Sequence, residues 1–425
     1  MQAAKHERHS KASTQAAELT RMRQGMNRYA RIALVTSSFF LIIMAVLVNS
    51  PPLFYMATAI IVTLGAARLQ AWLAVRGLRF ERIITPAVKA GESVIVNITV
   101  WSERRLKRPL VTIADHLPRQ LKISGETPSL PVAPSFDQPI QSRYSFKPMR
   151  RGRYTWSRLT VYGTDALGLI TIERTYNVDP VSLTVYPSPL PVSVSISPSG
   201  GWGMSELETG RSVGSGLDTK GIRSYVQGDP IKTIDWKSTA KTGNLMVKEF
   251  ESGTGVALRF FLQRVEGSDL GTNEVSTFEA MCGHTLFLGS GFLKHGAIIQ
   301  LPQMEEDESA RAHPEVRERD LREALTDIQA NYRDELSAEL RQLQNTVTRS
   351  DTVVILMTLQ DEGLPALLRE MSAAQKIVLL YDAKEYCEKP EDVGHLKLAV
   401  DPAYIGMLER NGAQTYLMPR VEKLI

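Results

Sequence analysis

Two apolar runs stand near the start of the chain. The first, residues 32–48 (IALVTSSFFLIIMAVLV), carries no charge and lies at the short end of the roughly 17 to 25 residues that cross a bilayer. The second, residues 53–67 (LFYMATAIIVTLGAA), continues through Arg68 into LQAWLAV, where the arginine can snorkel and the tryptophan can lie at the interface. The uncharged connection NSPP, residues 49–52, allows only a tight turn. The pattern predicts a transmembrane hairpin of two helices over residues 32–75.

Between residues 77 and 191 apolar and polar side chains alternate with period two. Such alternation, with many β-branched and aromatic residues, is typical of half-buried strands. Proline and glycine clusters separate the runs, so we expect a small antiparallel β-sandwich domain over residues 77–191. The expected strands cover residues 92–102, 108–115, 141–148, 153–163, 167–178 and 181–187.

The composition changes again after residue 191. Residues 192–216 are rich in serine and glycine without sustained periodicity, which indicates a linker. After a charged segment, residues 217–251, buried-strand patterns alternate with helical patterns through residues 252–425. This alternation predicts an α/β domain with a parallel sheet and helices on both faces. The expected strands lie within residues 255–263, 295–302, 351–359, 376–382 and 413–419.

The longest helical pattern, DLREALTDIQANYRDELSAELRQLQNTV, runs from Asp320 to Val347. Its apolar residues recur at three- and four-residue steps and form one stripe. We expect this stripe to pack into the core, and a partner-binding face is the alternative. The members of the stripe are Leu321, Leu325, Ile328, Tyr332, Leu336, Leu340 and Leu343.

The charge distribution and the cysteine content indicate on which side of the membrane the soluble part lies, and they point to no particular ligand. The net charge of +4 is small against 50 basic and 46 acidic residues, so no whole-protein field argues for nucleic acid. Basic residues flank the predicted hairpin, within the basic segment 1–31 and after residue 75, so the positive-inside rule places both termini and the soluble domains in the cytoplasm. The two cysteines give no disulfide framework and fit a reducing compartment. The alternatives are a cleaved signal peptide, or a second run buried in a soluble core, which would move the soluble part to the other face of the membrane.

Two short motifs have the composition of chemical sites without completing one. GSGLDTKG, residues 214–221, resembles a phosphate cradle but lacks the spacing of a nucleotide loop. Cys282 and His284, in MCGH, could be a nucleophile and a base or two metal ligands. Two residues do not complete a zinc site, and a cysteine in an apolar helical pattern is usually part of the core. We therefore expect neither a cofactor nor a metal.

The charged stretch GIRSYVQGDPIKTIDWKSTAKTGNLMVKEFE runs from Gly221 to Glu251. Its basic and acidic residues nearly balance, which argues against a nucleic-acid groove. Basic residues also flank its short-spaced carboxylates, which argues against a dedicated metal cage. Gly228 and Asp229 precede Pro230, a combination that favours a turn.

The second half of this stretch places Asp235 beside Trp236. A carboxylate against a large apolar ring needs donors to stay charged when it is partly buried, and Arg223 is the obvious bidentate partner. NLMVKEF, residues 244–250, has the pattern of a strand that returns toward the α/β domain. A structural ion-pair knot, a docking loop and an active site all remain open as interpretations.

The order of residues in this stretch is also specific. The positions concerned are Gly221, Ile222, Arg223, Tyr225, Gly228, Asp229, Ile234, Asp235, Trp236, Thr239, Ala240, Lys241 and Val247. They resemble the signature of the bacterial domain of unknown function 58 (DUF58) family. Lys232 and Lys241 stand where arginine is common, which keeps the charge but loses the planar fork.

The resemblance extends to a membrane hairpin, a β-rich segment containing RRGRYTWSRLTVYGTDALGLI (residues 150–170), and a C-terminal part similar to a von Willebrand factor A domain. In that superfamily a DxSxS loop after the first strand, with a distant Thr and Asp, forms a metal-ion-dependent adhesion site. Here RVEGSD, residues 264–269, has no DxSxS, and Asp361 is the only residue near an expected ligand position. One carboxylate is too few for a hard cation, so the resemblance implies no metal.

Proteins similar to this one often accompany MoxR-type AAA ATPases and transglutaminase-like membrane proteins. The resemblance therefore suggests a non-enzymatic adaptor or assembly factor, anchored in the bacterial cell membrane and binding such protein partners. A cell-envelope enzyme that uses Asp229 or Asp235 with Arg223 is the alternative, and a metal-dependent adhesion module is a third. The candidate partner-binding residues are Arg223, Tyr225, Gly228, Asp229, Asp235, Trp236 and Lys241.

Overall fold

The computed structural model divides the chain into two compact units. The first comprises Met1–Val88, Glu92–Pro148 and Tyr154–Leu183, and the second comprises Lys89–Gly91, Met149–Arg153 and Thr184–Ile425. Most of the predicted basic N-terminal segment lies outside the described residues. The residues that the structure describes are 29–105, 110–121, 128–136, 138–196, 219–224, 235–250, 257–272, 274–294, 297–304, 314–349, 351–373 and 375–420.

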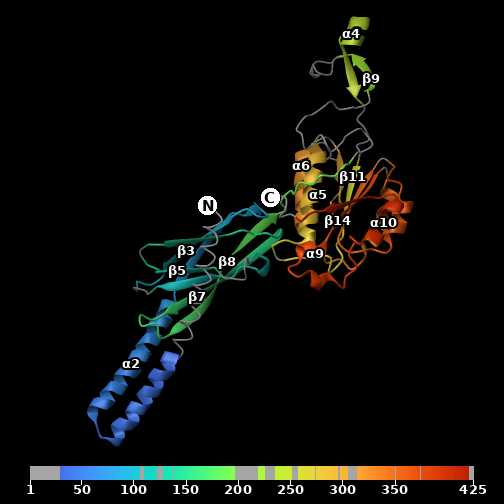
Figure 1. Cartoon of the computed structure of the whole chain (residues 1–425). Helices are drawn as coiled ribbons and strands as arrows, with labels where there is room; N and C mark the ends of the chain where they lie inside the picture. Colours follow the sequence, from blue (N-terminus) through green and yellow to red (C-terminus); the bar gives the residue numbers. More distant parts are fainter. Residues whose placement is uncertain are drawn as a thin grey trace, which may run out of the picture. The chain divides into compact units, whose positions relative to one another are not determined.

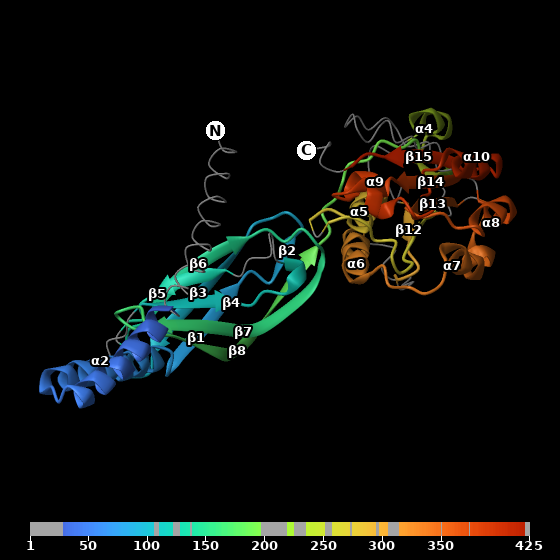
Figure 2. The same cartoon turned by 60° about the horizontal axis from the view of Figure 1, so that its bottom comes forward.

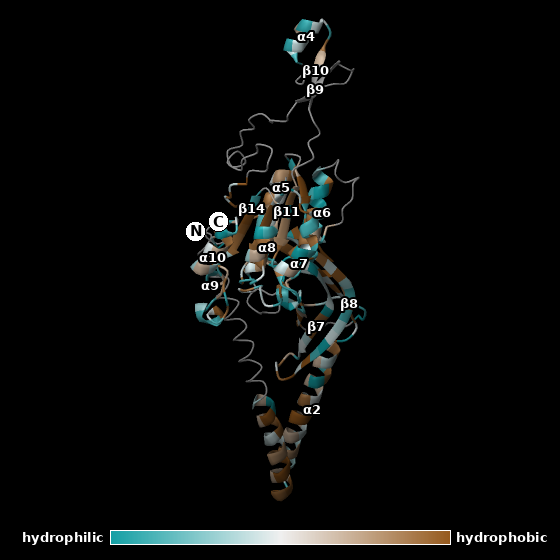
Figure 3. Ribbon diagram, turned by 90° about the vertical axis from the view of Figure 1, so that its right-hand side faces the viewer, coloured by the Kyte–Doolittle hydropathy of each residue, from teal (hydrophilic) through white to brown (hydrophobic). Residues whose placement is uncertain are grey.

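The first unit begins with two apolar helices, Tyr29–Leu47 and α2 (Pro51–Ala74). Both are long and apolar enough to cross a membrane, and the predicted pair of helices is present. A turn of three residues joins them and includes Asn49 with φ 48°, a left-handed conformation that asparagine tolerates. The helices lie side by side, apolar along their lengths, and the Ser38 hydroxyl donates to the Ala57 carbonyl oxygen at 3.5 Å (Figure 3).

The predicted β-rich region follows and is confirmed as two sheets (Figure 1). One sheet has the order β1-β3-β6 with antiparallel pairs, and the other has the order β2-β8-β7-β4-β5. The first sheet is made of β1 (Leu78–Ile84), β3 (Val94–Ser102) and β6 (Ile140–Phe146). The second is made of β2 (Ala87–Lys89), β4 (Val111–Asp115), β5 (Ser129–Val132), β7 (Gly152–Thr164) and β8 (Thr171–Tyr186).

Side chains from both sheets meet in one core that contains a buried ion pair. Arg82 of β1 lies 3.4 Å from the carboxylate of Asp115 in β4, and both side chains are buried. The Tyr144 hydroxyl of β6 donates to the same carboxylate at 2.6 Å. Burial raises the pKa of Asp115, against the lowering effect of the Arg82 charge. The pair therefore links the two sheets through a buried polar contact.

The α/β domain of the second unit has a sheet of five parallel strands in the order β12-β11-β13-β14-β15. This confirms the predicted parallel sheet. From β11 the chain moves to one side and then returns to the other, so the topological switch point lies between β11 and β13. The strands are β11 (Ala257–Leu262), β12 (Ile298–Gln300), β13 (Thr352–Met357), β14 (Gln375–Tyr381) and β15 (Gln414–Met418).

Helices cover both faces of this sheet (Figure 2). On one face pack α5 (Thr277–Lys294) and α6 (Pro314–Asp327). On the other face pack α7 (Leu336–Leu343), α8 (Leu364–Glu370) and α10 (Pro402–Arg410). The short helix α9 (Ala383–Tyr386) follows β14. The central strand β13 is buried along its whole length, as a strand between two helical layers must be.

The prediction of one long helix from Asp320 to Val347 is wrong. The apolar stripe is divided between the two faces of the sheet, because Leu321 and Leu325 pack with α5 whereas Leu336 and Leu340 pack with α8. Between them the backbone of Tyr332 donates to the Arg264 carbonyl oxygen at 2.8 Å and accepts from the Glu266 N–H at 2.9 Å. These bonds to a distant loop replace helical hydrogen bonds.

The start of the predicted linker is packed rather than solvated. Val192, Val194 and Ile196 alternate into the core beneath α5, and the Leu190 N–H donates to the Gly283 carbonyl oxygen at 3.1 Å. This extended segment is therefore part of the second unit. Residues 197–216, the rest of the predicted linker, lie outside the described residues.

Candidate functional site

The signature stretch contains two strands and one short helix. β9 (Thr219–Ser224) pairs antiparallel with β10 (Met246–Phe250), and α4 (Trp236–Thr242) lies between them in sequence. Tyr225, Gly228 and Asp229 lie outside the described residues, as does the side chain of Arg223. The geometry therefore bears on Asp235, Trp236 and Lys241 among the predicted site residues.

Asp235 is the N-cap of α4. Its side chain accepts hydrogen bonds from the Lys237 N–H at 3.2 Å and from the Ser238 hydroxyl at 2.9 Å. Its own N–H donates to the Met246 carbonyl oxygen at 2.8 Å, which ties the start of the helix to β10. A capping aspartate satisfies donors that the helix cannot satisfy itself. Asp235 thus has a structural task in this segment.

Trp236, the next residue, is 65% exposed. Lys237 and Lys241 of the same helix are exposed as well, as is Leu245, the residue before β10. The Met246 N–H donates to the Thr239 hydroxyl at 2.9 Å, which holds this end of the helix to the strand. Trp236, Lys237, Lys241 and Leu245 are called the Trp236 surface below. The short, capped helix therefore exposes a large ring and two lysine side chains.

The carboxyl edge of the sheet at the switch point is a second candidate site, because ligands of open α/β sheets bind there. Gln263 directly follows β11 there. Its Oε1 accepts from the backbone N–H groups of Thr358 and Leu359, at 2.9 and 2.8 Å, and its Nε2 donates to the Leu359 carbonyl oxygen at 2.9 Å. The carboxamide therefore joins the ends of β11 and β13 and has its hydrogen-bonding groups engaged.

Asp361, the residue nearest an expected metal-ligand position, is buried at the same edge. Its two oxygens accept from the Ser337 N–H at 2.7 Å and the Gly363 N–H at 2.9 Å. The Tyr404 hydroxyl also bonds to the main chain of Asp361. Among the described residues no group of three or more His, Cys, Asp or Glu side chains could hold a metal ion. At this edge the polar groups organise the main chain.

The MCGH motif lies inside the core of α5. The His284 Nδ1 is 2.7 Å from the Tyr381 hydroxyl, and both residues are buried. Burial lowers the pKa of His284 to about 4 and raises the pKa of Cys282 to about 12, so both groups are neutral near pH 7. A Cβ on Gly283 would lie 2.5 Å from the Leu190 side chain, so the glycine permits close packing of the extended segment. These contacts give the motif a packing role.

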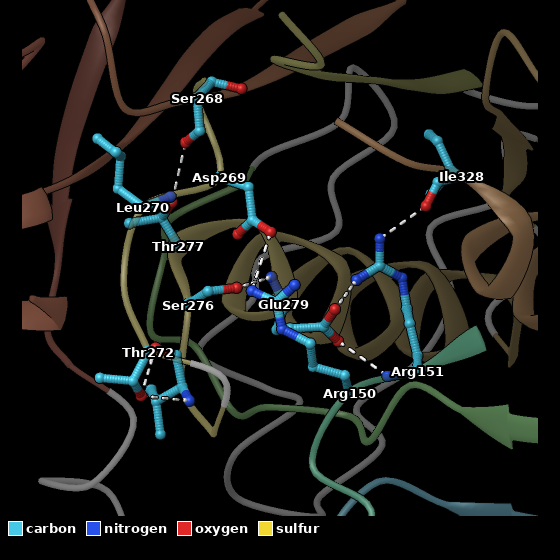
Figure 4. A network of polar contacts seen from close by, with 11 residues as sticks. Arg150, Arg151, Ser268, Asp269, Leu270, Thr272, Ser276, Thr277, Glu279 and Ile328 are labelled. Atoms are coloured by element: carbon cyan, nitrogen blue, oxygen red, sulfur yellow. Dashed lines mark hydrogen bonds and ion pairs between the residues drawn. The ribbon is translucent and has the colours of Figure 1, made fainter. Parts of the chain in front are cut away.

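The sequence interpretation missed a cluster around Arg151, shown in Figure 4. Arg151 Nε donates to the Leu325 carbonyl oxygen at 2.6 Å and its Nη2 donates to the Ile328 carbonyl oxygen at 2.8 Å. The same guanidinium pairs with Glu279 in the first turn of α5. Beside it, Arg150 pairs with Asp269 at 3.1 Å. The signal in the sequence was the run RRGR, but its partners lie more than a hundred residues further along the chain.

These features define the class of protein: two apolar N-terminal helices, a β-rich region, and a parallel-sheet α/β domain preceded in sequence by the capped signature segment. Residues 221–409 match the model of the family described as "Protein of unknown function DUF58". The curated "Uncharacterized protein YeaD" of Bacillus subtilis (strain 168) is 27% identical over 213 residues, which are 48% of this chain and 50% of the relative. The chain thus spans about half the length of the curated relative it matches.

Likeness to solved structures is weak. The solution structure of a CARDB domain from Pyrococcus furiosus is 13% identical and covers 26% of this chain and 94% of that chain, with a TM-score of 0.19. A crystal structure of the same domain in complex with di-metal ions is also 13% identical. It covers 25% of this chain and 91% of that chain, with a TM-score of 0.18. A β-glucuronidase of Parabacteroides merdae with glycerol in its active site is 10% identical. It covers 80% of this chain and 34% of that chain, with a TM-score of 0.17. At these TM-scores none of them supports an argument about fold or function.

Proposed function

We propose that the protein is a non-enzymatic adaptor or assembly factor, anchored in the bacterial membrane, that binds protein partners through the Trp236 surface and the α/β domain. The anchor would be the helices Tyr29–Leu47 and α2, whose length and apolar character suit a bilayer. The basic residues that flank them favour cytoplasmic soluble domains.

The observation that carries this proposal is that Asp235 and Trp236, although adjacent, have different surroundings. The carboxylate accepts two hydrogen bonds that begin α4, whereas the adjacent ring is exposed. Exposed tryptophans on preformed elements are typical centres of protein interfaces, because they bury much area at small entropic cost. A capping carboxylate is less suited to acid–base catalysis, so this geometry favours the adaptor over the enzyme alternative.

The proposal includes the finer assignment of the C-terminal domain as von Willebrand factor A-like. The parallel sheet with helices on both faces is compatible with that class, and the carboxyl edge would be its binding edge. Gln263 and Asp361 are engaged with the main chain there, which supports partner binding without a bridging divalent metal. The partners that the DUF58 resemblance suggests, a MoxR-type AAA ATPase and a transglutaminase-like membrane protein, belong to the same proposal.

The test is site-specific photo-crosslinking of the full chain in its native membrane. A photoreactive amino acid replaces Trp236 in one variant and Leu417, an exposed residue of β15, in the control. We expect a discrete protein adduct at position 236 that the control does not give, and we expect Trp236→Ala to lose that partner during purification in mild detergent. Absence of a protein adduct at position 236, or identical adducts at both positions, would remove the main support for the adaptor function.

A further inference from the structure

The turn between β7 and β8 exposes a leucine at its tip and is closed by hydrogen bonds to Asp165. Asp165 closes the turn, since its two carboxylate oxygens accept from the Ile170 N–H at 2.6 Å and the Leu167 N–H at 3.0 Å. The Asp165 carbonyl oxygen accepts from the Gly168 N–H at 3.0 Å, and the Asp165 side chain is buried. Leu167 at the tip is 65% exposed. The only carboxylate of the turn therefore points inward, and an apolar side chain points out.

This turn packs against the carboxyl-terminal part of α2. The Ala166 N–H donates to the Gln70 side-chain oxygen at 3.1 Å. Ala67 and Ala71 of α2 form a small apolar cluster with Ile170, against which Leu169 and Ile172 also pack. Figure 3 shows the turn beside this end of the helix. Within the first unit, the contacts thus fix the level of the turn along α2.

For a bilayer that α2 spans from Pro51, that level corresponds to the second membrane–water boundary. Gln70 is the twentieth residue of α2, so at 1.5 Å per residue it lies about 30 Å along the helix from Pro51. The hydrocarbon core of a bilayer is about 30 Å thick. One half-turn later Trp72 lies under the guanidinium of Arg76, with 3.9 Å from the Arg76 Cζ to the ring centroid. Tryptophan and arginine at a helix end are the residues that mark a membrane–water interface.

We propose that residues 165–170 form a lipid-contacting turn, in which Leu167 enters the interfacial layer of the bilayer beside α2. The inference rests on the proposed membrane anchoring and adds a third contact to the two helices. Leu69, one residue before Gln70 on α2, is also exposed and lies at nearly the same level along that helix. A leucine fixed at this level meets headgroups and upper acyl chains, which suit an apolar side chain on a turn with no outward charge.

The test uses the full chain reconstituted in vesicles of phosphatidylethanolamine and phosphatidylglycerol. Single cysteines at chosen positions, in a Cys282→Ala, Cys387→Ser background, carry an environment-sensitive fluorophore. We expect the label at position 167 to show blue-shifted emission and to be quenched by doxyl groups held near the lipid headgroups. Ala166→Cys supplies a second position in the same turn, so that a folding failure at position 167 leaves the proposal testable.

Two further labels separate the possible outcomes. Ile95→Cys is the matched control, because Ile95 is an exposed aliphatic residue toward the far end of β3 from Ser102, which pairs with Leu78 just after α2. Val62→Cys, exposed in the middle of α2, reports the membrane span itself through quenching by doxyl groups placed deep in the acyl chains. Quenching at 62 and 167 but not at 95 supports the lipid-contacting turn. Quenching at 62 alone overturns it while the anchor stands, and no quenching at 62 overturns the anchor and the turn together.

Discussion

The guanidinium of Arg151 pairs with the carboxylate of Glu279 inside the second unit, where only 3% of the Arg151 side chain is exposed (Figure 4). The same side chain donates to the carbonyl oxygens of Leu325 and Ile328 near the end of α6. It also lies over the ring of Phe278, 4.8 Å from the centroid. One arginine therefore satisfies a carboxylate at the start of α5 and two carbonyl groups beside α6.

Removing this arginine should destabilise the second unit strongly. Arg151→Met keeps much of the side-chain volume but leaves Glu279 without its cation, and breaking a buried pair in this way costs roughly 3 to 5 kcal/mol. Arg153→Met is the matched control, because Arg153 pairs with Glu323 and Asp327 at the surface with 52% of its side chain exposed. For that control we expect a loss below about 1 kcal/mol. Urea unfolding of the full chain in detergent measures both, and equal losses would contradict the buried role of Arg151.

Because Asp235 caps α4, we expect the stability of this segment to depend on the hydrogen-bond-accepting oxygen of the side chain and much less on its negative charge. Asparagine caps helices about as well as aspartate, so Asp235→Asn should be nearly neutral, whereas Asp235→Ala should cost about 1 kcal/mol. Hydrogen exchange of the α4 amides, Thr239 in particular, is the direct measurement. If Asp235 were held mainly by a buried ion pair with Arg223, Asp235→Asn would instead lose roughly 3 to 5 kcal/mol.

Local patterns predicted the elements whose periodicity is strong. The uninterrupted apolar run of β13 and the alternating run of β3 indicate from the local sequence alone which side chains are buried. Both strands were therefore predicted to within a few positions. β1, with sequence LRFERII, was missed because charged residues break its pattern, although Arg82 is buried by an ion pair to another strand. Burial of a charge depends on its partner, which the local sequence does not contain.

The same limit explains what was not predicted from the sequence near the candidate site. DWKS has the composition of an N-cap, but that role was not predicted for Asp235. The helix break near Tyr332 depends on the loop after β11, and the role of Arg151 depends on α5 and α6. These contacts join segments far apart in the sequence, so no pattern within one segment encodes them.

Two glycines of α5 should respond differently to alanine. A Cβ at position 283 would lie 2.8 Å from the Ser188 carbonyl oxygen, which is backbone and cannot easily move. A Cβ at position 289 would meet the flexible end of the Leu321 side chain at 2.4 Å. Alanine favours the helix by about 1 kcal/mol at either position. We expect Gly283→Ala to be destabilising by about 1 to 3 kcal/mol and Gly289→Ala to be closer to neutral, as measured by thermal unfolding.

The polar groups at the switch point predict insensitivity to divalent metals. Because Asp361 and Gln263 bond to the main chain, Mg²⁺ or Ca²⁺ at millimolar concentration should not change the melting temperature of the full chain. A metal bound to the native state would raise it by mass action. Asp361→Ala should itself destabilise the domain by about 1 to 3 kcal/mol, because the buried Ser337 N–H and the partly buried Gly363 N–H lose their acceptor. A metal-dependent rise that Asp361→Ala abolishes would restore the adhesion-site hypothesis.

Buried His284 predicts a loss of stability in mild acid. Burial lowers its pKa to about 4 from an ordinary value near 6.5, so between these two values the unfolded chain binds more protons than the folded chain. The stabilising contribution of the neutral imidazole is therefore complete above pH 6.5 and is lost as the pH falls toward 4. The full shift corresponds to a free energy of unfolding on the order of 3 kcal/mol.

The measurement compares the wild-type chain with His284→Gln, which can still bond to Tyr381. Between pH 7 and pH 5 the wild-type protein should lose more unfolding free energy than the variant, since only the wild-type protein must keep a buried imidazole neutral. His395→Gln removes an exposed imidazole and serves as the control, with a pH dependence that should follow the wild-type protein. If His284→Gln shows the same pH slope as the wild-type protein, His284 does not carry the acid sensitivity.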